Sequence, residues 1–317
     1  MKSFVLRKFL ILLCLIGGLA HIVEARDSAL LKCQDIFAFE AGKDSTSSWL
    51  PFSVSSFFSS FTGYEDSQIQ NLIKNHQWQE AIWLANRKGY LELKEGLQAT
   101  LFEILTNEKR VTLSKKIALI GVNEIYLATF QSGIHAVFKP HPDYWIQINK
   151  KYAWAHNVPA EIDAYLIDQI LDLNIVPMTV ERTIDGMKGS LQVFVVKDQN
   201  KDPNFVDHSH PDFKKMKLLD YLIRNGDRHS NNFLILPDKI AAIDHGQSFL
   251  AHISDIGTVF TFLHQVPIDS TTLPFIHRMK THLTPEVIWT LLHERHAVNV
   301  IEELIYRRKL LLNRSGL

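Results

Sequence analysis

Cysteine is almost absent from this 317-residue sequence, which contains only two, Cys14 and Cys33. Cys14 lies inside an N-terminal apolar run, so only Cys33 would remain after a leader is removed, and one cysteine cannot form an internal disulfide. The sequence therefore excludes a fold that depends on a disulfide framework. It also lacks a Cys-x-x-Cys pair and a Gly-x-Ser-x-Gly elbow, the patterns of thiol redox sites and of many serine hydrolases.

Net charge is missing as well, because 34 Lys and Arg residues balance 34 Asp and Glu residues. A neutral chain has no global electrostatic attraction to nucleic acid or to an anionic membrane, so neither is an expected partner on this ground. Zinc chemistry is also disfavoured. The pairs His208-Ser-His210 and His293-Glu-Arg-His296 have ligand-like spacing, but the remaining ligands of a zinc site are lacking, and these histidines are expected to be solvated.

Long apolar runs are scarce, and the single notable one extends from Phe9 to Ala20. It is too short to span a bilayer comfortably. Basic residues precede it, and Val23-Glu24-Ala25 offers small residues at the usual cleavage positions. This pattern predicts a secretory signal peptide over residues 1–25, with an uncleaved anchor as the alternative.

The rest of the chain has the composition of a globular protein, with 46% hydrophobic residues. Residues 26–64 have Ser and Phe clusters and are predicted to be an irregular arm or linker, with a strand as the alternative. Residues 65–110 show helical periodicity, and Gly89 is expected to divide them into a helix pair. The segment from Trp78 to Ala85 resembles one helix of a tetratricopeptide-like hairpin, but it occurs once, which favours a plain helical prefix.

After residue 111 the apolar pattern first becomes strand-like and later helical. The predicted strands are Ile117–Ile120, Ile125–Phe130, His135–Phe138 and Leu191–Val196. The predicted helices are Glu161–Leu173, which Pro159 precedes, followed by Phe213–Ile223, Pro285–Leu292 and Val298–Leu312.

The polar run Asn225-Gly-Asp-Arg-His-Ser-Asn-Asn232 follows one predicted helix, and Asp244 stands between apolar Ile243 and His245-Gly246. An Asp, an Asn five residues later and an Asp twelve residues beyond that are typical of a kinase catalytic loop and its metal-binding aspartate. Asp227 would accept a hydrogen bond from an acceptor hydroxyl, and Arg228 would neutralise charge in the loop. Asn232 and Asp244 would supply oxygen ligands for Mg²⁺. The alternative is a polar turn that closes a helix.

Lys139 ends a predicted strand, where its ammonium could reach nucleotide phosphates. Glu161, early in the next helix, would pair with it, and Asp163 is a competing partner. A surface lysine and an acid that favours the helix dipole are the alternatives. The turn at Gly121 is the expected phosphate-covering loop, but it has one glycine, and Glu124 adds negative charge.

Five blocks of the chain resemble, in order, motifs of type II phosphatidylinositol 4-kinases and, more broadly, the phosphatidylinositol 3/4-kinase catalytic fold. The blocks are Ala136-Val-Phe-Lys-Pro140, Leu173-Asn-Ile-Val-Pro177, Gly189-Ser-Leu-Gln-Val-Phe-Val195, Leu219-Asp-Tyr-Leu-Ile-Arg-Asn225 and Ala241-Ala-Ile-Asp-His-Gly246. The resemblance implies a two-lobed α+β kinase fold that uses ATP and Mg²⁺. It also implies that Gln192, Val193 and Phe194 form the hinge against adenine.

A second resemblance leads to a different acceptor. Ala160-Glu-Ile-Asp-Ala-Tyr-Leu-Ile-Asp168 and Asn225-Gly-Asp-Arg-His229 are also similar to secretory-pathway kinases of the Four-jointed type, which phosphorylate secreted proteins or glycans and carry signal peptides. Bacterial HipA-like kinases are more distant relatives. The sequence departs from the type II lipid kinases at residues 141–158, where their palmitoylated cysteines are absent, and at His245, where they have Asn.

These observations predict an antiparallel-sheet N-lobe with the hinge over residues 111–198 and a mostly helical C-lobe over 199–317, preceded by the helical prefix. The predicted activity is transfer of the γ-phosphate of ATP to a hydroxyl of an inositol lipid. The alternatives are an exported protein or glycan kinase and a nucleotide-binding pseudokinase or scaffold. The aromatic and lysine residues of 141–158 are the candidate membrane contact, with a packed insert as the alternative.

Overall fold

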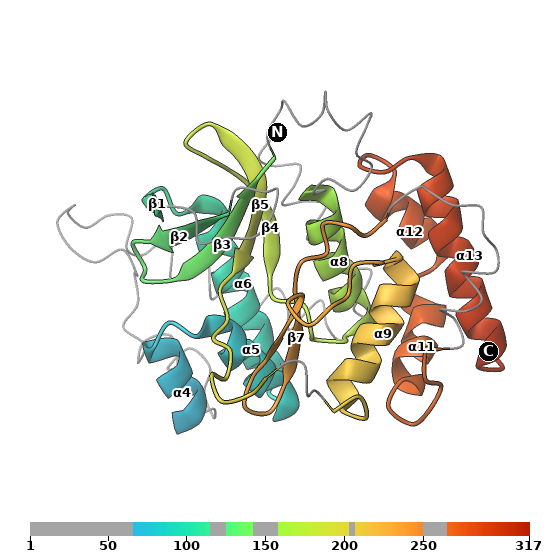
Figure 1. Cartoon of the computed structure of the whole chain (residues 1–317). Helices are drawn as coiled ribbons and strands as arrows, with labels where there is room; N and C mark the ends of the chain where they lie inside the picture. Colours follow the sequence, from blue (N-terminus) through green and yellow to red (C-terminus); the bar gives the residue numbers. More distant parts are fainter. Residues whose placement is uncertain (1–65, 115–124, 142–157, 203–206, 250–264) are drawn as a thin grey trace. The chain divides into compact units, whose positions relative to one another are not determined.

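The computed structural model describes residues 66–114, 125–141, 158–202, 207–249 and 265–317 (Figure 1). The predicted signal peptide, the arm over 26–64, the predicted strand Ile117–Ile120, Gly121 with Glu124, and the insert from 142 to 157 lie outside the described residues. The chain divides into two compact units. The first consists of Met1–Arg110 with Phe130–Ile134, and the second of Val111–Thr129 with His135–Leu317.

The described residues of the first unit form three helices, α4 (Ser67–Lys74), α5 (Trp78–Arg87) and α6 (Leu91–Asn107). The predicted break at Gly89 is present, and Gly89 has a positive φ of 74° that glycine tolerates well. A second break, at His76 with φ 59°, was not predicted and makes three helices instead of a pair. Asp66 caps α4 by accepting hydrogen bonds from the backbone N–H groups of Gln68 and Ile69.

The second unit is built on a five-stranded antiparallel sheet in the order β1-β2-β3-β5-β4. The strands are β1 (Val111–Ser114), β2 (Tyr126–Phe130), β3 (His135–Pro140), β4 (Thr179–Ile184) and β5 (Met187–Val193). The predicted strands at 125–130 and 135–138 are therefore confirmed, whereas the strand predicted over 191–196 begins and ends earlier. β4 was not predicted. The mixture of this sheet with helices confirms the α+β class.

The register of the sheet brings one set of side chains to a common face. Val137 is opposite Leu127 on β2 and opposite Gln192 on β5, and Lys139 is opposite Ser190. Because side chains alternate along a strand, Leu127, Val137, Lys139 and Gln192 share a half-buried face. Phe138 and Leu191 point to the opposite face and are fully buried. Gly189 is required where the strands meet, since a Cβ there would collide with the carbonyl oxygen of Lys139.

Helix α8 (Val158–Leu171) carries Glu161 and Asp163, the two acidic residues predicted as possible partners of Lys139. It is buried around most of its circumference and packs against β4 and β5, as Figure 1 shows. The helix starts at Val158, three residues before the predicted start at Glu161. Pro159 lies in its first turn, where the missing N–H removes no intrahelical hydrogen bond. Asp168 accepts hydrogen bonds from the N–H groups of Ile175 and Val176, which organises the chain after the helix.

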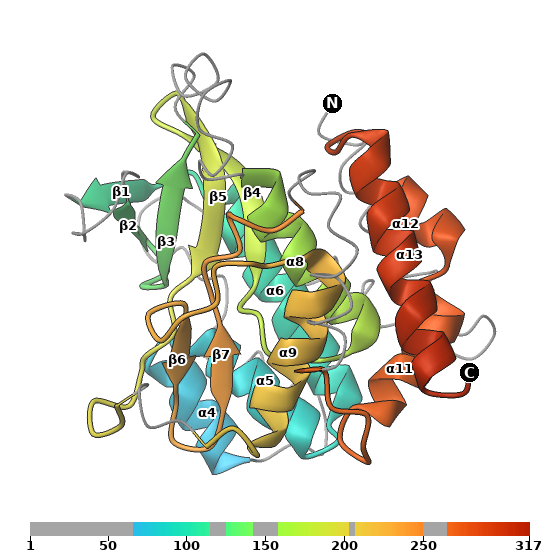
Figure 2. The ribbon, with the colours of Figure 1, turned by 45° about the vertical axis from the view of Figure 1, so that its right-hand side comes forward.

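The C-terminal part of this unit is mostly helical. It contains α9 (Pro211–Ile223), the hairpin of β6 (Phe233–Ile235) and β7 (Ile240–Ala242), α11 (Leu273–His282), α12 (Pro285–Leu292) and α13 (Val298–Arg314). Figure 2 shows the hairpin beside α9 and the three last helices grouped together. α9, α12 and α13 agree with the predicted helices within about two residues, whereas α11 was not predicted.

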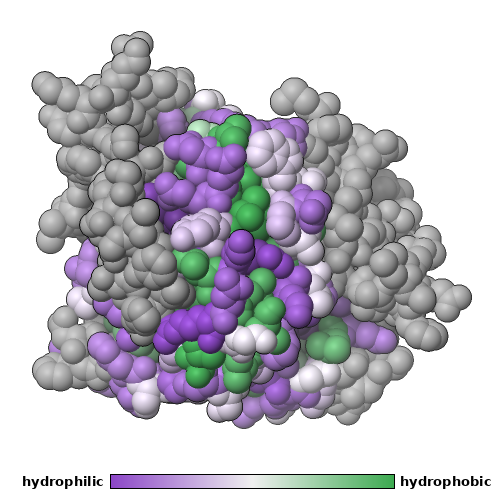
Figure 3. Space-filling view, turned by 90° about the vertical axis from the view of Figure 1, so that its right-hand side faces the viewer, coloured by the Kyte–Doolittle hydropathy of each residue, from purple (hydrophilic) through white to green (hydrophobic). Residues whose placement is uncertain are grey.

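The outer face of the C-terminal helices is mixed in polarity. Trp289 on α12 and Val298 and Tyr306 on α13 are exposed large hydrophobic residues. Figure 3 shows hydrophobic and hydrophilic residues interleaved on this side of the molecule. No helix within the described residues is apolar over a stretch long enough to cross a lipid bilayer.

Candidate active site

Lys139 connects two acidic residues from different parts of the second unit. Its ammonium lies 2.6 Å from Oε1 of Glu161 on α8 and 2.9 Å from Oδ1 of Asp244, which follows β7. Glu161 is fully occupied on both oxygens, because Oε2 accepts a hydrogen bond from the backbone N–H of His245 at 3.0 Å. The structure therefore brings together the strand lysine, the helix glutamate and the second aspartate of the sequence motif.

The two carboxylates beside Lys139 stabilise its charged ammonium form. Burial lowers the pKa of Lys139, but the carboxylates of Glu161 and Asp244 outweigh burial and hold that pKa above its ordinary value. Burial also raises the pKa of Glu161, against the opposing effect of Lys139. Lys139 is thus a retained cation at the edge of a half-buried sheet face, in the position from which it could bind phosphate oxygens.

Asp227 and Asn232 lie in the loop after α9 and contact each other. The amide nitrogen of Asn232 donates to the carbonyl oxygen of Asp227 at 2.7 Å and to its Oδ2 at 3.2 Å. The loop starts where Arg224 ends α9 in a left-handed conformation, with φ 54°. The N–H of Ile243 donates to the carbonyl of Asn232, which extends the β6–β7 pairing and sets Asn232 beside the start of the Asp244 segment.

Arg228 joins α9, the loop of Asp227 and the Asp244 segment through its guanidinium. Its guanidinium has five N–H donors. Two bind the carboxylate of Asp220 on α9, two bind the backbone carbonyls of Asn232 and Ile243, and one binds Nε2 of His245. With every donor engaged inside the protein, Arg228 holds the loop and the Asp244 segment together and leaves no N–H group for a substrate.

His245 is fully buried beside this arginine. Burial, and then the positive charge of Arg228, hold the pKa of His245 well below its usual range. The imidazole is therefore neutral at physiological pH. Nε2 of its ring lies 3.0 Å from Nη2 of Arg228.

Two oxygen-bearing side chains fit a divalent cation. The side chain of Asp244 is 44% exposed, and Asn232 uses its amide nitrogen on Asp227, so the oxygen Oδ1 is the atom of Asn232 that could bind a cation. Within the described residues no group of three or more His, Cys, Asp or Glu side chains could hold a metal by itself. Mg²⁺ is usually bound by one or two protein oxygens together with substrate phosphates, so a two-ligand site suits that ion in a nucleotide complex.

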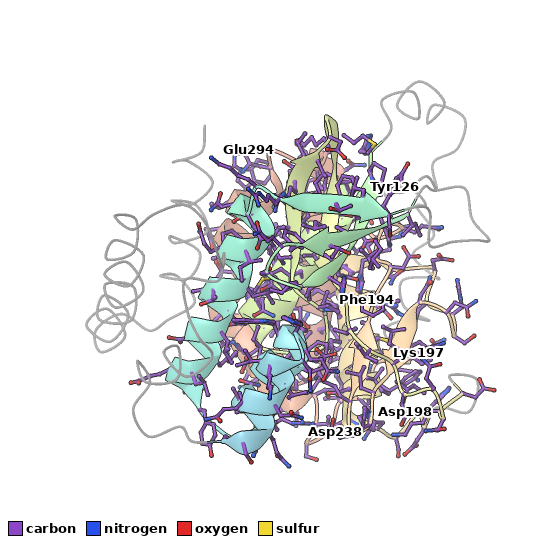
Figure 4. The ribbon with its side chains drawn as sticks, turned by 90° about the vertical axis from the view of Figure 1, so that its left-hand side faces the viewer. Tyr126, Phe194, Lys197, Asp198, Asp238 and Glu294 are labelled. Carbon is purple, nitrogen blue, oxygen red and sulfur yellow. The ribbon has the colours of Figure 1, made fainter. Side chains whose placement is uncertain are left out.

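The predicted hinge residues divide between the strand and the segment that follows it. Gln192 and Val193 belong to β5, and Gln192 donates a hydrogen bond to the hydroxyl of Thr179 at 2.9 Å. Phe194 lies beyond the strand, is 43% exposed, and donates its N–H to the carbonyl of His135. Figure 4 shows Phe194, Lys197 and Asp198 in succession from the sheet toward the β6–β7 hairpin, whose turn carries Asp238.

Asp220 is a position in the site to which the sequence patterns assigned no role. Asp220, seven residues before Asp227 on the last turns of α9, anchors Arg228 and also accepts a hydrogen bond from Asn225. The signal available was an acid in a helix that leads directly to the loop. Gly121, the expected phosphate-covering position, lies outside the described residues.

Asp163 does not compete for Lys139. It is fully buried on α8 and bound by Arg295 and by Nε2 of His296, the latter at 2.7 Å. Both partners come from the turn between α12 and α13. The side chain of His296 is only 3% exposed, so the expectation that it is solvated is wrong. The reason is its buried acidic partner 133 positions away, which local spacing could not indicate.

Comparison with known proteins gives one family. The family model described as phosphatidylinositol 3- and 4-kinase matches residues 130–305. Among solved structures, the Golgi casein kinase with Mn and ADP bound is similar at a TM-score of 0.47 and 16% identity, over 86% of this chain and 93% of that chain. The Helicobacter pylori proinflammatory kinase CtkA reaches a TM-score of 0.40 at 14% identity, over 64% of this chain and 92% of that chain.

Hydra Fam20 with sugar is also similar, with a TM-score of 0.39 and 11% identity, over 69% of this chain and 88% of that chain. No curated protein matches the chain in sequence.

Proposed function

Because the chain belongs to the phosphatidylinositol 3- and 4-kinase family, whose model matches more than half of it, we propose that Lys139, Glu161, Asp227, Asn232 and Asp244 transfer the γ-phosphate of ATP to a hydroxyl acceptor. The observation that carries the assignment of these residues is the position of Lys139, whose ammonium contacts both Glu161 and Asp244. This arrangement unites a phosphate-binding cation with a metal-binding carboxylate, as phosphoryl transfer requires.

Each residue has a separate task in this proposal. Glu161 fixes Lys139, which binds phosphate oxygens of the nucleotide. Asp227 accepts a hydrogen bond from the acceptor hydroxyl and orients it in line with the γ-phosphate. Asn232 and Asp244 hold Mg²⁺, which when bound neutralises the negative charge of the phosphates. The half-buried face with Leu127, Val137 and Gln192 receives the adenine ring.

An inositol lipid is the acceptor that we propose first. The family match and the five ordered sequence blocks support it. A protein or glycan hydroxyl is the second candidate, and the N-terminal pattern of residues 1–25 supports it, because that pattern predicts export to a compartment with such acceptors. We also propose that the aromatic and lysine residues of 141–158 contact a membrane if the acceptor is a lipid.

The test uses the protein without residues 1–25, Mg²⁺-ATP labelled in the γ-phosphate, and acceptors offered separately. Phosphatidylinositol vesicles, a serine-rich protein and a glycan make up the set, and Asp227→Ala is the control for contaminating kinases. Labelled lipid without labelled protein or glycan would support the first acceptor, and the reverse would support the second. No transfer to any acceptor, with Mg²⁺-ATP still bound, would leave a pseudokinase and overturn the proposed activity.

A further inference from the structure

His245 contacts both Glu161 on α8 and Arg228 in the loop of Asp227. Its backbone N–H donates to Oε2 of Glu161 at 3.0 Å, and its ring Nε2 lies 3.0 Å from Nη2 of Arg228. The ring is 0% exposed. Through one residue, therefore, the helix that fixes Lys139 is joined to the arginine that organises the loop of Asp227.

The partner of Nε2 determines where the ring carries its proton. A guanidinium can only donate hydrogen bonds, so Nε2 must be the unprotonated acceptor. The neutral ring then carries its hydrogen on Nδ1. That atom lies 4.0 Å from Oε2 of Glu161, beyond hydrogen-bond distance, and has no hydrogen-bond partner in the part of the chain that the structure describes. A buried N–H donor without a partner is destabilising, so the hydrogen bond of Nε2 to Arg228 is formed while Nδ1–H stays unsatisfied.

The other contacts of Arg228 show what this acceptor controls. The same guanidinium holds the backbone carbonyls of Asn232 and Ile243, which neighbour the two proposed metal ligands, and is anchored by Asp220 on the far side. Removal of the acceptor at Nε2 would leave one buried donor of Arg228 unsatisfied. The guanidinium would then rotate toward another acceptor and move those two carbonyls with it.

We propose that His245 is a positioning residue for phosphoryl transfer. Its Nε2, an acceptor in the Nδ1–H tautomer, fixes Arg228 and thereby the backbone at Asn232 and Ile243. This role rests on the proposed kinase function. Because Asn232 and Asp244 are also the proposed ligands of the nucleotide-bound Mg²⁺, we expect the loss of His245 to lower the rate of transfer, together with a smaller loss of affinity for Mg²⁺-ATP.

Three substitutions separate the effect of the hydrogen-bond acceptor at Nε2 from the effect of side-chain volume. His245→Gln places an amide oxygen near the position of Nε2, His245→Met has the same length without a strong acceptor, and His245→Asn places its polar group near the position of Nδ1. We expect kcat for His245→Gln within about threefold of the unmodified protein. We expect His245→Met and His245→Asn to lose about 10- to 100-fold in kcat, with a smaller rise in KM for ATP. Equal kcat for the Gln and Met variants, at equal melting temperature, would overturn the proposal.

A second measurement does not depend on turnover. Long-range ¹⁵N–¹H correlation spectra of the unmodified protein with labelled histidine report the tautomer of each ring, and His245→Gln assigns the signal of His245. We expect a protonated Nδ1 and an unprotonated Nε2. A protonated Nε2 would overturn the inference even if the enzyme is active. Absence of transfer by the unmodified protein would instead overturn the proposed function, so the two failures are distinguishable.

Discussion

The carboxylate of Asp244 accepts a hydrogen bond from the ammonium of Lys139 at 2.9 Å, although the two residues are 105 positions apart. Asp244 lies two residues after the end of β7 and has a left-handed backbone conformation, with φ 57°. A cation that binds Asp244 must therefore share this carboxylate with Lys139. The structure thus links the proposed metal ligand and the proposed phosphate-binding lysine through one ion pair.

The first prediction concerns Asp244→Asn. Asn tolerates a positive φ, so the backbone should persist, while the loss of charge removes the main metal ligand. We expect the stabilisation by Mg²⁺-ATP, measured as a rise in melting temperature, to fall by most of its value. Chelation of the metal should have the same effect on the unmodified protein.

Asp185→Asn is the matched control for this experiment, since Asp185 also has a positive φ, of 50°, in the exposed turn between β4 and β5. It should keep the full ligand-induced rise. An undiminished rise in the Asp244→Asn variant would contradict the assignment of Asp244 as a metal ligand.

The second prediction concerns the contact between α8 and the α12–α13 turn. Asp163 is fully buried and bound by Arg295 and His296. Asp163→Asn leaves these donors without a carboxylate, so we expect the free energy of unfolding to fall by about 2 kcal/mol or more, measured by urea titration. Since α8 also carries Glu161, we expect kcat of the Asp163→Asn variant to fall as well.

Glu181→Gln is the control, because Glu181 pairs with Lys188 at 3.1 Å on the exposed surface of β4 and β5. Exposed ion pairs contribute little, so the unfolding free energy should change by less than about 1 kcal/mol. Equal losses in free energy of unfolding for the two variants would mean that the buried contact of Asp163 stabilises the fold no more than an exposed ion pair.

The third prediction concerns Asp168 and pH. Burial raises the pKa of Asp168 from 3.8 to about 6, although the N–H groups of Ile175 and Val176 oppose the shift by donating to it. Between about pH 4 and pH 6 the folded protein therefore binds this proton more readily than the unfolded chain. Its contribution to stability is present at low pH and is lost as the pH rises through 6.

Asp168→Asn has no such charge and retains an oxygen for the two N–H groups. We expect the free energy of unfolding of the variant to increase relative to that of the unmodified protein between pH 5 and pH 8, by about 1–3 kcal/mol. Urea unfolding at several pH values measures this difference. A difference that is constant with pH would show that Asp168 is charged throughout.

The sequence predicted the family and the α+β class because the kinase motifs are local and ordered, and the family match confirms the resemblance. Lys139, Glu161, Asp227, Asn232 and Asp244 could all be listed from short patterns. What the patterns could not supply was the partner of each group.

Arg228 shows the limit most clearly. From the sequence it is a cation in a polar loop, whereas in the structure a helix residue, two backbone carbonyls and a buried histidine use all of its donors. The strand β4 was missed because Glu181-Arg-Thr183 interrupts its apolar residues, and α11 because only Ile276 and Met279 among its residues are buried. Burial by distant elements, not local propensity, determines both.

In the proposed mechanism Asp227 serves phosphoryl transfer and does not bind the nucleotide. Transfer of labelled γ-phosphate to the best acceptor should be measured for the unmodified protein and for Asp227→Asn, together with the affinity of each for Mg²⁺-ATP. We expect a loss of transfer of about 100-fold or more in the variant, with affinity for Mg²⁺-ATP retained within a few-fold. Near-normal transfer by Asp227→Asn, or loss of nucleotide binding in step with transfer, would contradict it.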